Sequence, residues 1–128
     1  MATVVVFNEP VLDRMLNSPE GDVGIYLARR GRLIVLAAKK QVGVDTGQLR
    51  ESIHMRHLYD GRGQFLLIGS DKKHALAHHE GTRPHIITPN RAQTLKFVRG
   101  AQVVYAKRVY HPGTKANRYL TDHLRLVK

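Results

Sequence analysis

The spacing of hydrophobic and polar positions changes along the chain, from a helical period near the N-terminus to shorter, strand-like runs further on. Residues 10–16 open with a proline and repeat apolar side chains four apart, which predicts a short helix after a brief extended segment. A second helix is expected to run to about Val42, with Ser18 as its N-cap, Pro19 as its first helical residue and Gly43 as its stop.

From Glu51 onward the pattern favours strands. Residues 52–59 and 64–69 flank a glycine-rich turn and predict a hairpin. Residues 73–80 predict one or two helical turns that end at Gly81. Three more strands and a terminal helix are expected at residues 85–88, 95–98, 103–109 and 118–127. Helices that flank a mostly antiparallel sheet make an α+β fold.

The organisation indicated is a single domain over residues 1–128, because no repeat, low-complexity tract or Pro/Gly/Ser-rich linker divides the chain. A long N-terminal helix and a C-terminal helix are expected to pack on the sheet. The expected parts are an extended segment with a short helix, the long helix, the β-sheet region and the C-terminal helix, at residues 1–18, 19–43, 44–110 and 111–128.

The long helix carries small side chains at alternating spacings of four and three, which places them in one stripe. Such a stripe lets another backbone approach closely. The partner is either the chain's own sheet or a helix of another subunit, and apolar residues on all sides of Leu33–Leu36 favour the second. The helix positions expected at an oligomer contact are Gly24, Ala28, Gly31, Ile34, Val35 and Ala38.

Composition narrows the chemistry available to the chain. It has no cysteine, which excludes disulfides, thiolate nucleophiles and iron–sulfur ligation. Its longest strongly apolar run, Leu33 to Ala38, is far shorter than the ~20 residues of a transmembrane helix. The first residues lack the basic leader of a signal peptide, so we expect synthesis in the cytoplasm and no membrane partner.

The net charge of +11 is concentrated in the last third of the chain. Ten Lys and Arg residues follow Glu80, against a single acidic residue, Asp122. Such a surface faces solvent, a polyanion or an acidic protein. With five Tyr, three Phe and no Trp, the chain shows no aromatic cluster of the kind that reads RNA, and no zinc finger. A nucleic-acid-binding domain with sequence-independent phosphate contacts remains the alternative.

Motifs of enzymes are present only in fragments. Asp45-Thr46-Gly47 is the tripeptide of aspartic proteases, but the residues around it do not fit. The structural interpretation is a turn that Asp45 caps through its side chain and for which Gly47 supplies the backbone freedom. His74 and His78 share a helical spacing without the HExxH arrangement of a metalloprotease, so we expect no metal. Gly113-Thr114-Lys115 lacks the first glycine of a phosphate-binding loop. We therefore expect no catalytic residue and no cofactor.

Three segments taken in order are more specific than any one alone. They read VDTGQLRESI at residues 44–53, AHHEGTRPHIITP at residues 77–89 and HPGTKANRYL at residues 111–120. Together they resemble the neck or tail-completion proteins of long-tailed bacteriophages, in which similar turns occur in the same order. The chain departs from that pattern at His79-Glu80-Gly81, which lacks the aromatic often found between Glu and Gly, and at Arg118-Tyr119, where Pro-Phe is usual.

The resemblance implies a structural virion protein at the neck between head and tail, and not an enzyme. Its subunits would assemble with one another as a ring, between head-closure proteins and the tail-terminator or tail-tube proteins, around or beside the packaged DNA. The motif residues either shape the fold or contact neighbouring rings, for which Arg83, His85, Lys115 and Asn117 are the candidates. The full set is Asp45, Thr46, Gly47, Leu49, Glu80, Gly81, Thr82, Arg83, Pro84, His85, His111, Pro112, Gly113, Thr114, Lys115 and Asn117.

Overall fold

A computed structural model describes residues 2–127 of the chain. These residues form two compact units. Unit 1 combines residues up to Ala75 with those from Arg118 onward, and unit 2 comprises residues 76–117. No helix among the described residues is both long enough and apolar enough to cross a membrane.

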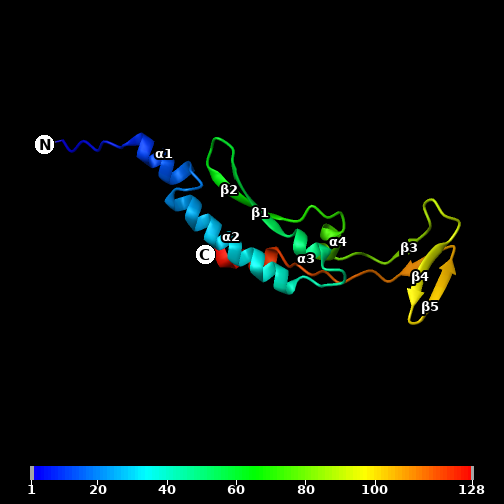
Figure 1. Cartoon of the computed structure of the whole chain (residues 1–128). Coiled ribbons are helices and arrows are strands. Elements are labelled where there is room, and N and C mark those ends of the chain that lie inside the picture. Colours follow the sequence, from blue (N-terminus) through cyan, green and yellow to red (C-terminus); the bar gives the residue numbers. More distant parts are fainter. Residues whose placement is uncertain (1, 128) are drawn as a thin grey trace. The chain divides into compact units, whose positions relative to one another are not determined.

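Unit 1 begins with an exposed extended segment followed by two consecutive helices, α1 (Glu9–Asn17) and α2 (Asp22–Gln41) (Figure 1). The N-cap of α2 is Gly21, where we had predicted Ser18. The Ser18 hydroxyl instead accepts the N–H of Glu20 within the turn between the helices. Glycine is needed at position 21 because a Cβ there would lie 2.2 Å from the Arg14 carbonyl oxygen. The close approach of the two helices therefore sets the helix start.

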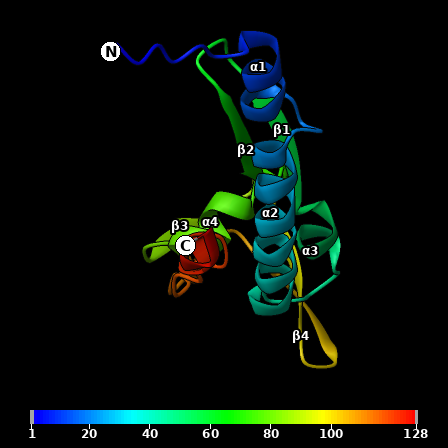
Figure 2. The same cartoon turned by 90° about the vertical axis from the view of Figure 1, so that its left-hand side faces the viewer.

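The hairpin β1 (His54–Tyr59) and β2 (Gln64–Gly69) is antiparallel, as predicted, and α2 lies across one of its faces (Figure 2). Alternation along the strands points Met55, Leu66 and Ile68 at the helix. A Cβ on Gly31 would lie 2.6 Å from Cδ1 of Leu66, so the absence of a side chain brings helix and hairpin together.

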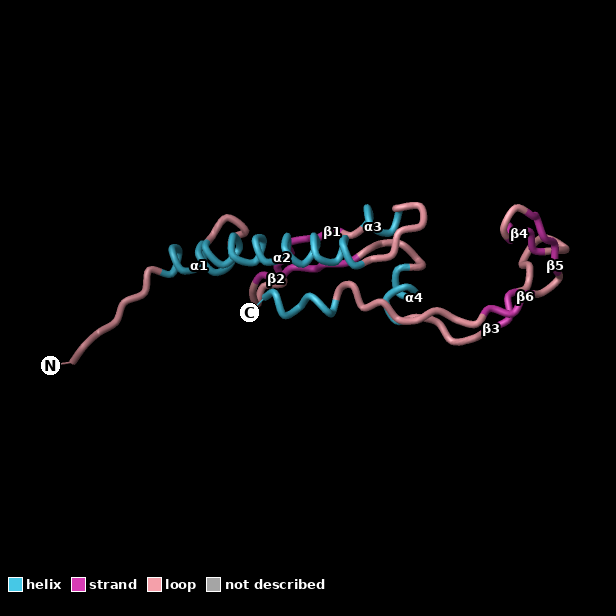
Figure 3. Tube along the Cα trace, turned by 90° about the horizontal axis from the view of Figure 1, so that it is seen from below, coloured by secondary structure: helices cyan, strands magenta, loops and turns pink. Residues whose placement is uncertain are grey.

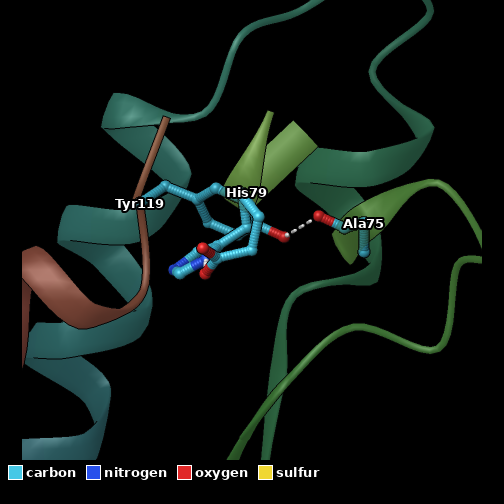
Figure 4. Close-up of polar contacts among 4 residues, drawn as sticks. Ala75, His79 and Tyr119 are labelled. Carbon is cyan, nitrogen blue, oxygen red and sulfur yellow. Dashed lines mark hydrogen bonds and ion pairs between the residues drawn. The ribbon is translucent and has the colours of Figure 1, made fainter. Parts of the chain in front are cut away.

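The core of unit 1 lies where the C-terminal half of α2 meets the short helix α3 (Gln48–Ser52). Its buried residues come from four separate parts of the chain: Ala38, Val42, Leu49, Ile53, Ala75 and Tyr119. The Tyr119 side chain is 1% exposed, and its hydroxyl donates a hydrogen bond of 3.5 Å to the carbonyl of Ala75 (Figure 4). Desolvation by burial raises the pKa of this phenol above its ordinary value of about 10.

The predicted terminal helix is present as η1 (Thr121–Val127), and its conformation is 3₁₀. It runs back along α2. The last carbonyl groups of a helix have no partner within the helix, and side chains of α2 donate hydrogen bonds to those of η1. The Tyr26 hydroxyl donates to the Val127 carbonyl at 2.9 Å, and the Arg30 guanidinium donates to the Leu126 carbonyl at 3.3 Å. Contacts with α2 therefore supply hydrogen bonds that further α-helical turns would otherwise provide.

Unit 2 contains most of α4 (Ala75–Glu80) and four strands: β3 (His85–Ile87), β4 (Leu95–Arg99), β5 (Gln102–Ala106) and β6 (Val109–His111). Strand β3 pairs with β6, and β4 with β5, both antiparallel (Figure 3). The pairs are nested, so residues 82–114 form one ribbon that turns back at Gly100 and Ala101.

The α+β class predicted from the sequence is confirmed, but the expected single sheet is three separate two-stranded pairs. The strand predicted over residues 103–109 is divided between β5 and β6, because its two ends pair with different partners. The predicted helical turn before Gly81 is present as α4, and Gly81 has the positive φ of 74° that ends it.

Candidate functional site

The turn at Asp45-Thr46-Gly47 belongs to unit 1 and joins α2 to α3. Gly47 is the N-cap of α3 with a left-handed φ of 83°, which is the backbone freedom predicted for it. Leu49 is buried in the core, whereas Asp45 and Thr46 are exposed. Among the described residues, the Asp45 carboxylate accepts no hydrogen bond, so the predicted side-chain cap is absent from the structure.

The other two motifs meet each other in unit 2. Thr82 of one and Thr114 of the other exchange backbone hydrogen bonds, each N–H donating to the partner's carbonyl at 3.0 Å. Their hydroxyl oxygens are 3.1 Å apart. Two Gly-Thr dipeptides that are 32 positions apart in the sequence therefore form a single paired element at the base of the ribbon.

The two glycines of this element have no room for a side chain. A Cβ on Gly113 would lie 2.3 Å from the carbonyl oxygen of Thr82, and one on Gly81 would lie 2.5 Å from that of Thr114. Both residues also have a positive φ, 85° and 74° respectively. Each glycine is thus required twice, by its own conformation and by the close approach of the opposite segment.

Beyond the threonine pair, the same register places Pro84 opposite Pro112 and His85 opposite His111. Hydrogen-bonded pairs alternate along an antiparallel ladder, so the two prolines occupy the position where both strands would next donate. Neither has an N–H, and the ladder is interrupted there. The imidazoles of His85 and His111 stack at 5.0 Å between ring centroids.

Polar contacts fix the ends of these motifs. The backbone N–H of Asn117 donates to the His78 carbonyl at 3.1 Å, which ties the third motif to α4. The N–H of Gly113 donates to Nδ1 of His111 at 3.0 Å. Glu80 lies 2.6 Å from Nδ1 of His79. Arg83 and Lys115 are exposed, so their side chains are accessible to a partner.

The ribbon is strongly basic. Between Glu80 and Asp122 there is no acidic residue. The basic side chains of unit 2 are all exposed: Arg83, Arg91, Lys96, Arg99, Lys107, Arg108 and Lys115. Because like charges repel, a surface of this kind favours contact with an anionic partner.

Unit 2 also lacks an apolar core of its own. Of residues 76–117, all of which the structure describes, His79 is the only one that is buried. Large apolar side chains of the ribbon are exposed at Ile86, Val98, Val103, Tyr105 and Tyr110. Two-stranded pairs are marginally stable in water without a packed face, so the ribbon presents surface that another protein can cover.

The small residues of α2, which we expected at a contact between subunits, pack against other parts of their own chain. Gly24, Gly31, Ile34 and Ala38 are buried, and Ala28 and Val35 are half-buried. Gly24 is closed off by the turn that follows α1, and Gly31 by the hairpin. These glycines therefore serve packing within the chain, the alternative that the sequence left open, and a neighbouring helix could reach Gly31 only by displacing β1 and β2.

A groove that the sequence did not reveal lies between α2 and β1. It has a volume of about 270 Å³ and is lined by Arg32, Val35, Leu36 and Met55. The apolar spacing of Leu33–Leu36 indicated that this part of α2 is apolar all round, but not that Met55 of β1 completes a concave surface with it.

A polar depression of about 380 Å³ lies beside α3, lined by Gln48, Glu51, Ser52, His54, Asp71 and Lys72. Its serine is not paired with a base. The Ser52 hydroxyl donates to the Leu49 carbonyl and lies 2.6 Å from the Ser70 hydroxyl, while Nδ1 of His54 faces the Ser52 carbonyl. Nowhere in residues 2–127 do three or more His, Asp or Glu side chains gather as metal ligands.

Comparison with known proteins adds no relative, since no family model, no curated protein and no solved structure matches the chain.

Proposed function

We propose that this chain is a structural subunit of the head–tail connector of a long-tailed bacteriophage. In this proposal it is made in the cytoplasm of the host bacterium and assembles with copies of itself as a ring in the neck of the virion. The ring joins head-closure proteins to the tail-terminator or tail-tube proteins and surrounds or adjoins the path of the DNA.

The observation that carries the proposal is the ribbon of unit 2. Two of the three connector-like motifs meet there through Thr82 and Thr114, and beyond them the strands expose apolar side chains with no buried apolar residue in the unit. A segment built in this way gains stability by packing on other subunits. Gly81 and Gly113 are required by the pairing itself, while Arg83 and Lys115 are exposed and free to contact a neighbouring protein.

The test is a phage in which the gene for this chain carries a nonsense codon. Growth in a non-suppressing host should yield filled heads and complete tails that are not joined, and supplying the wild-type chain should restore infectious particles. Mass spectrometry of purified wild-type virions should detect the chain, and imaging of the neck should show its ring. Joined, infectious particles that lack the chain would overturn the proposal.

The second candidate is a nucleic-acid-binding domain, favoured by the uninterrupted basic composition from residue 81 to residue 121. It predicts binding to duplex DNA of any sequence, with a logarithmic salt slope of about −0.9 for each phosphate neutralised. Replacing Lys96, Arg99 and Lys107 by glutamine should then reduce the slope. A control variant with Lys39 and Lys40 replaced should leave it unchanged, because those residues lie on α2. Absence of binding at low salt would exclude this candidate.

A further inference from the structure

The first described residues form an apolar arm that its own chain does not cover. The arm, residues 2–7, is extended and exposed throughout, and it reads Ala-Thr-Val-Val-Val-Phe. Val4 is 79% exposed and Val6 is 85% exposed. β-branched and aromatic residues favour strands, and an exposed apolar run of this kind is costly to leave in water. We therefore expect the apolar side chains of the arm to pack against an apolar surface.

The groove between α2 and β1 supplies such a surface. Its lining includes Val35, Leu36 and Met55, and Leu36 is 58% exposed. Within the described residues β1 pairs only with β2, so the other edge of β1 has free backbone donors and acceptors. An extended segment can add to such an edge while placing alternate side chains in the groove. The groove and the arm are thus complementary in backbone conformation and in polarity.

Charge agrees with this pairing. Residues 2–8 carry no charged side chain, and the first charge after the arm is negative, at Glu9. The charged residue that lines the groove is positive, Arg32. An arm lying in the groove therefore buries no ionised side chain of its own. The acidic Glu9 at the end of the arm has the opposite charge to Arg32 of the groove.

The arm does not reach the groove of its own chain. α1 lies beyond the N-terminal end of α2 in each view (Figures 1, 2 and 3). At 1.5 Å per residue, the nine residues of α1 span about 13 Å, and Arg32 lies about 15 Å along α2. Six residues extend at most about 20 Å, less than the roughly 28 Å that they would have to span back. The occupant that fits is the arm of another copy.

We propose that the arm, residues 2–7, binds in the groove lined by Arg32, Val35, Leu36 and Met55 of a second copy of this chain. The contact joins two different surfaces of identical subunits, so it is heterologous and generates a ring when the rotation closes. It deepens the proposed function and rests on that function for the ring's place in the virion. The contact between copies can be tested on the purified protein alone.

The chain has no cysteine, so an introduced pair can report the contact without background. Phe7→Cys protein mixed with Leu36→Cys protein should form a disulfide-linked dimer under mild oxidation. The double variant, Phe7→Cys with Leu36→Cys in one chain, should form a ladder of linked chains. The matched control pairs Phe7→Cys with Leu67→Cys, since Leu67 is 55% exposed on the strand face turned away from α2. The proposal is overturned if the Phe7→Cys and Leu36→Cys proteins cross-link no more than the control pair. It is also overturned if the double variant forms its disulfide within single chains.

A second measurement uses no cross-link. Leu36→Asp should weaken self-association, measured by sedimentation velocity, by roughly tenfold or more, as expected when a charge enters a desolvated apolar contact. Leu67→Asp should leave it unchanged, and thermal melts should show that both variants remain folded. Equal effects of the two substitutions, or a wild-type chain that stays monomeric at high concentration, overturn the proposal. Neither result bears on whether the chain is found in the neck of the virion, which the nonsense mutant tests separately.

Discussion

Thr82 and Thr114 hold the two ends of the ribbon together by exchanging a pair of 3.0 Å backbone hydrogen bonds. The glycine that precedes each threonine allows this, because the opposite backbone occupies the space where a side chain would lie. The pairing makes the stability of the ribbon depend on two residues that carry no side chain.

Gly113→Ala should disrupt this pairing. The new Cβ would lie 2.3 Å from the Thr82 carbonyl oxygen at a φ of 85°, so strain and clash combine, and we expect a cost of about 3 kcal/mol. Hydrogen exchange at the amides of Thr82 and Thr114 would measure it as lost protection. Gly61→Ala is the control, because Gly61 has a φ of 83° with open space around it. Equal loss of stability in the two variants would show that strain alone decides the effect.

Gly31→Leu should destabilise unit 1 by separating α2 from the hairpin. The side chain would have to displace Leu66 and Met55, and overpacking of this kind costs about 1–3 kcal/mol. Chemical denaturation monitored by circular dichroism would measure the loss. Arg29→Leu is the control on the same helix, since Arg29 is exposed. Wild-type stability in the Gly31 variant would contradict the close packing described here.

Tyr119 should make the fold sensitive to alkaline pH. Burial raises the pKa of this phenol, so the unfolded chain releases the proton first, at a pH of about 10, while the folded chain retains it. Stability due to the neutral phenol is therefore complete below pH 10 and is lost as the pH rises toward the folded pKa. Melting temperatures between pH 8 and pH 11 should fall more steeply for the wild type than for Tyr119→Phe.

Tyr119→Phe also measures how much the Tyr119 hydroxyl contributes to stability. At neutral pH, Tyr119→Phe should cost no more than about 1 kcal/mol, because the hydrogen bond to the Ala75 carbonyl is long at 3.5 Å. The other tyrosines are exposed, so Tyr119 is the phenol whose burial the substitution tests. Parallel melting profiles of wild type and variant across this pH range would contradict the assignment to Tyr119.

Local signals in the sequence predicted the elements that depend on local chemistry. Helical spacing and a proline located α1, and glycines located the hairpin turn. Gly47 was expected to supply backbone freedom and Gly81 to end a helical turn. The α+β class follows from such signals, since each one depends on residues within a few positions of one another.

Contacts between distant segments could not be read in the same way. The start of α2 at Gly21 depends on the carbonyls of α1, and the 3₁₀ conformation of η1 accompanies hydrogen bonds from Tyr26 and Arg30. The pairing of Thr82 with Thr114 corresponds to one visible feature of the sequence, a Gly-Thr dipeptide in each motif. Nothing in the sequence indicated that the two dipeptides face each other, or that Met55 completes a groove with α2.

The facing prolines have a mechanical consequence. The ribbon is joined by cross-strand hydrogen bonds at Thr82 and Thr114 and again along β3 and β6, but at Pro84 and Pro112 neither strand has an N–H to donate. A bend at that level breaks no backbone hydrogen bond, whereas a bend on either side does. The ribbon can therefore bend at Pro84 and Pro112 at low energetic cost, while the pairs on either side of them stay hydrogen-bonded.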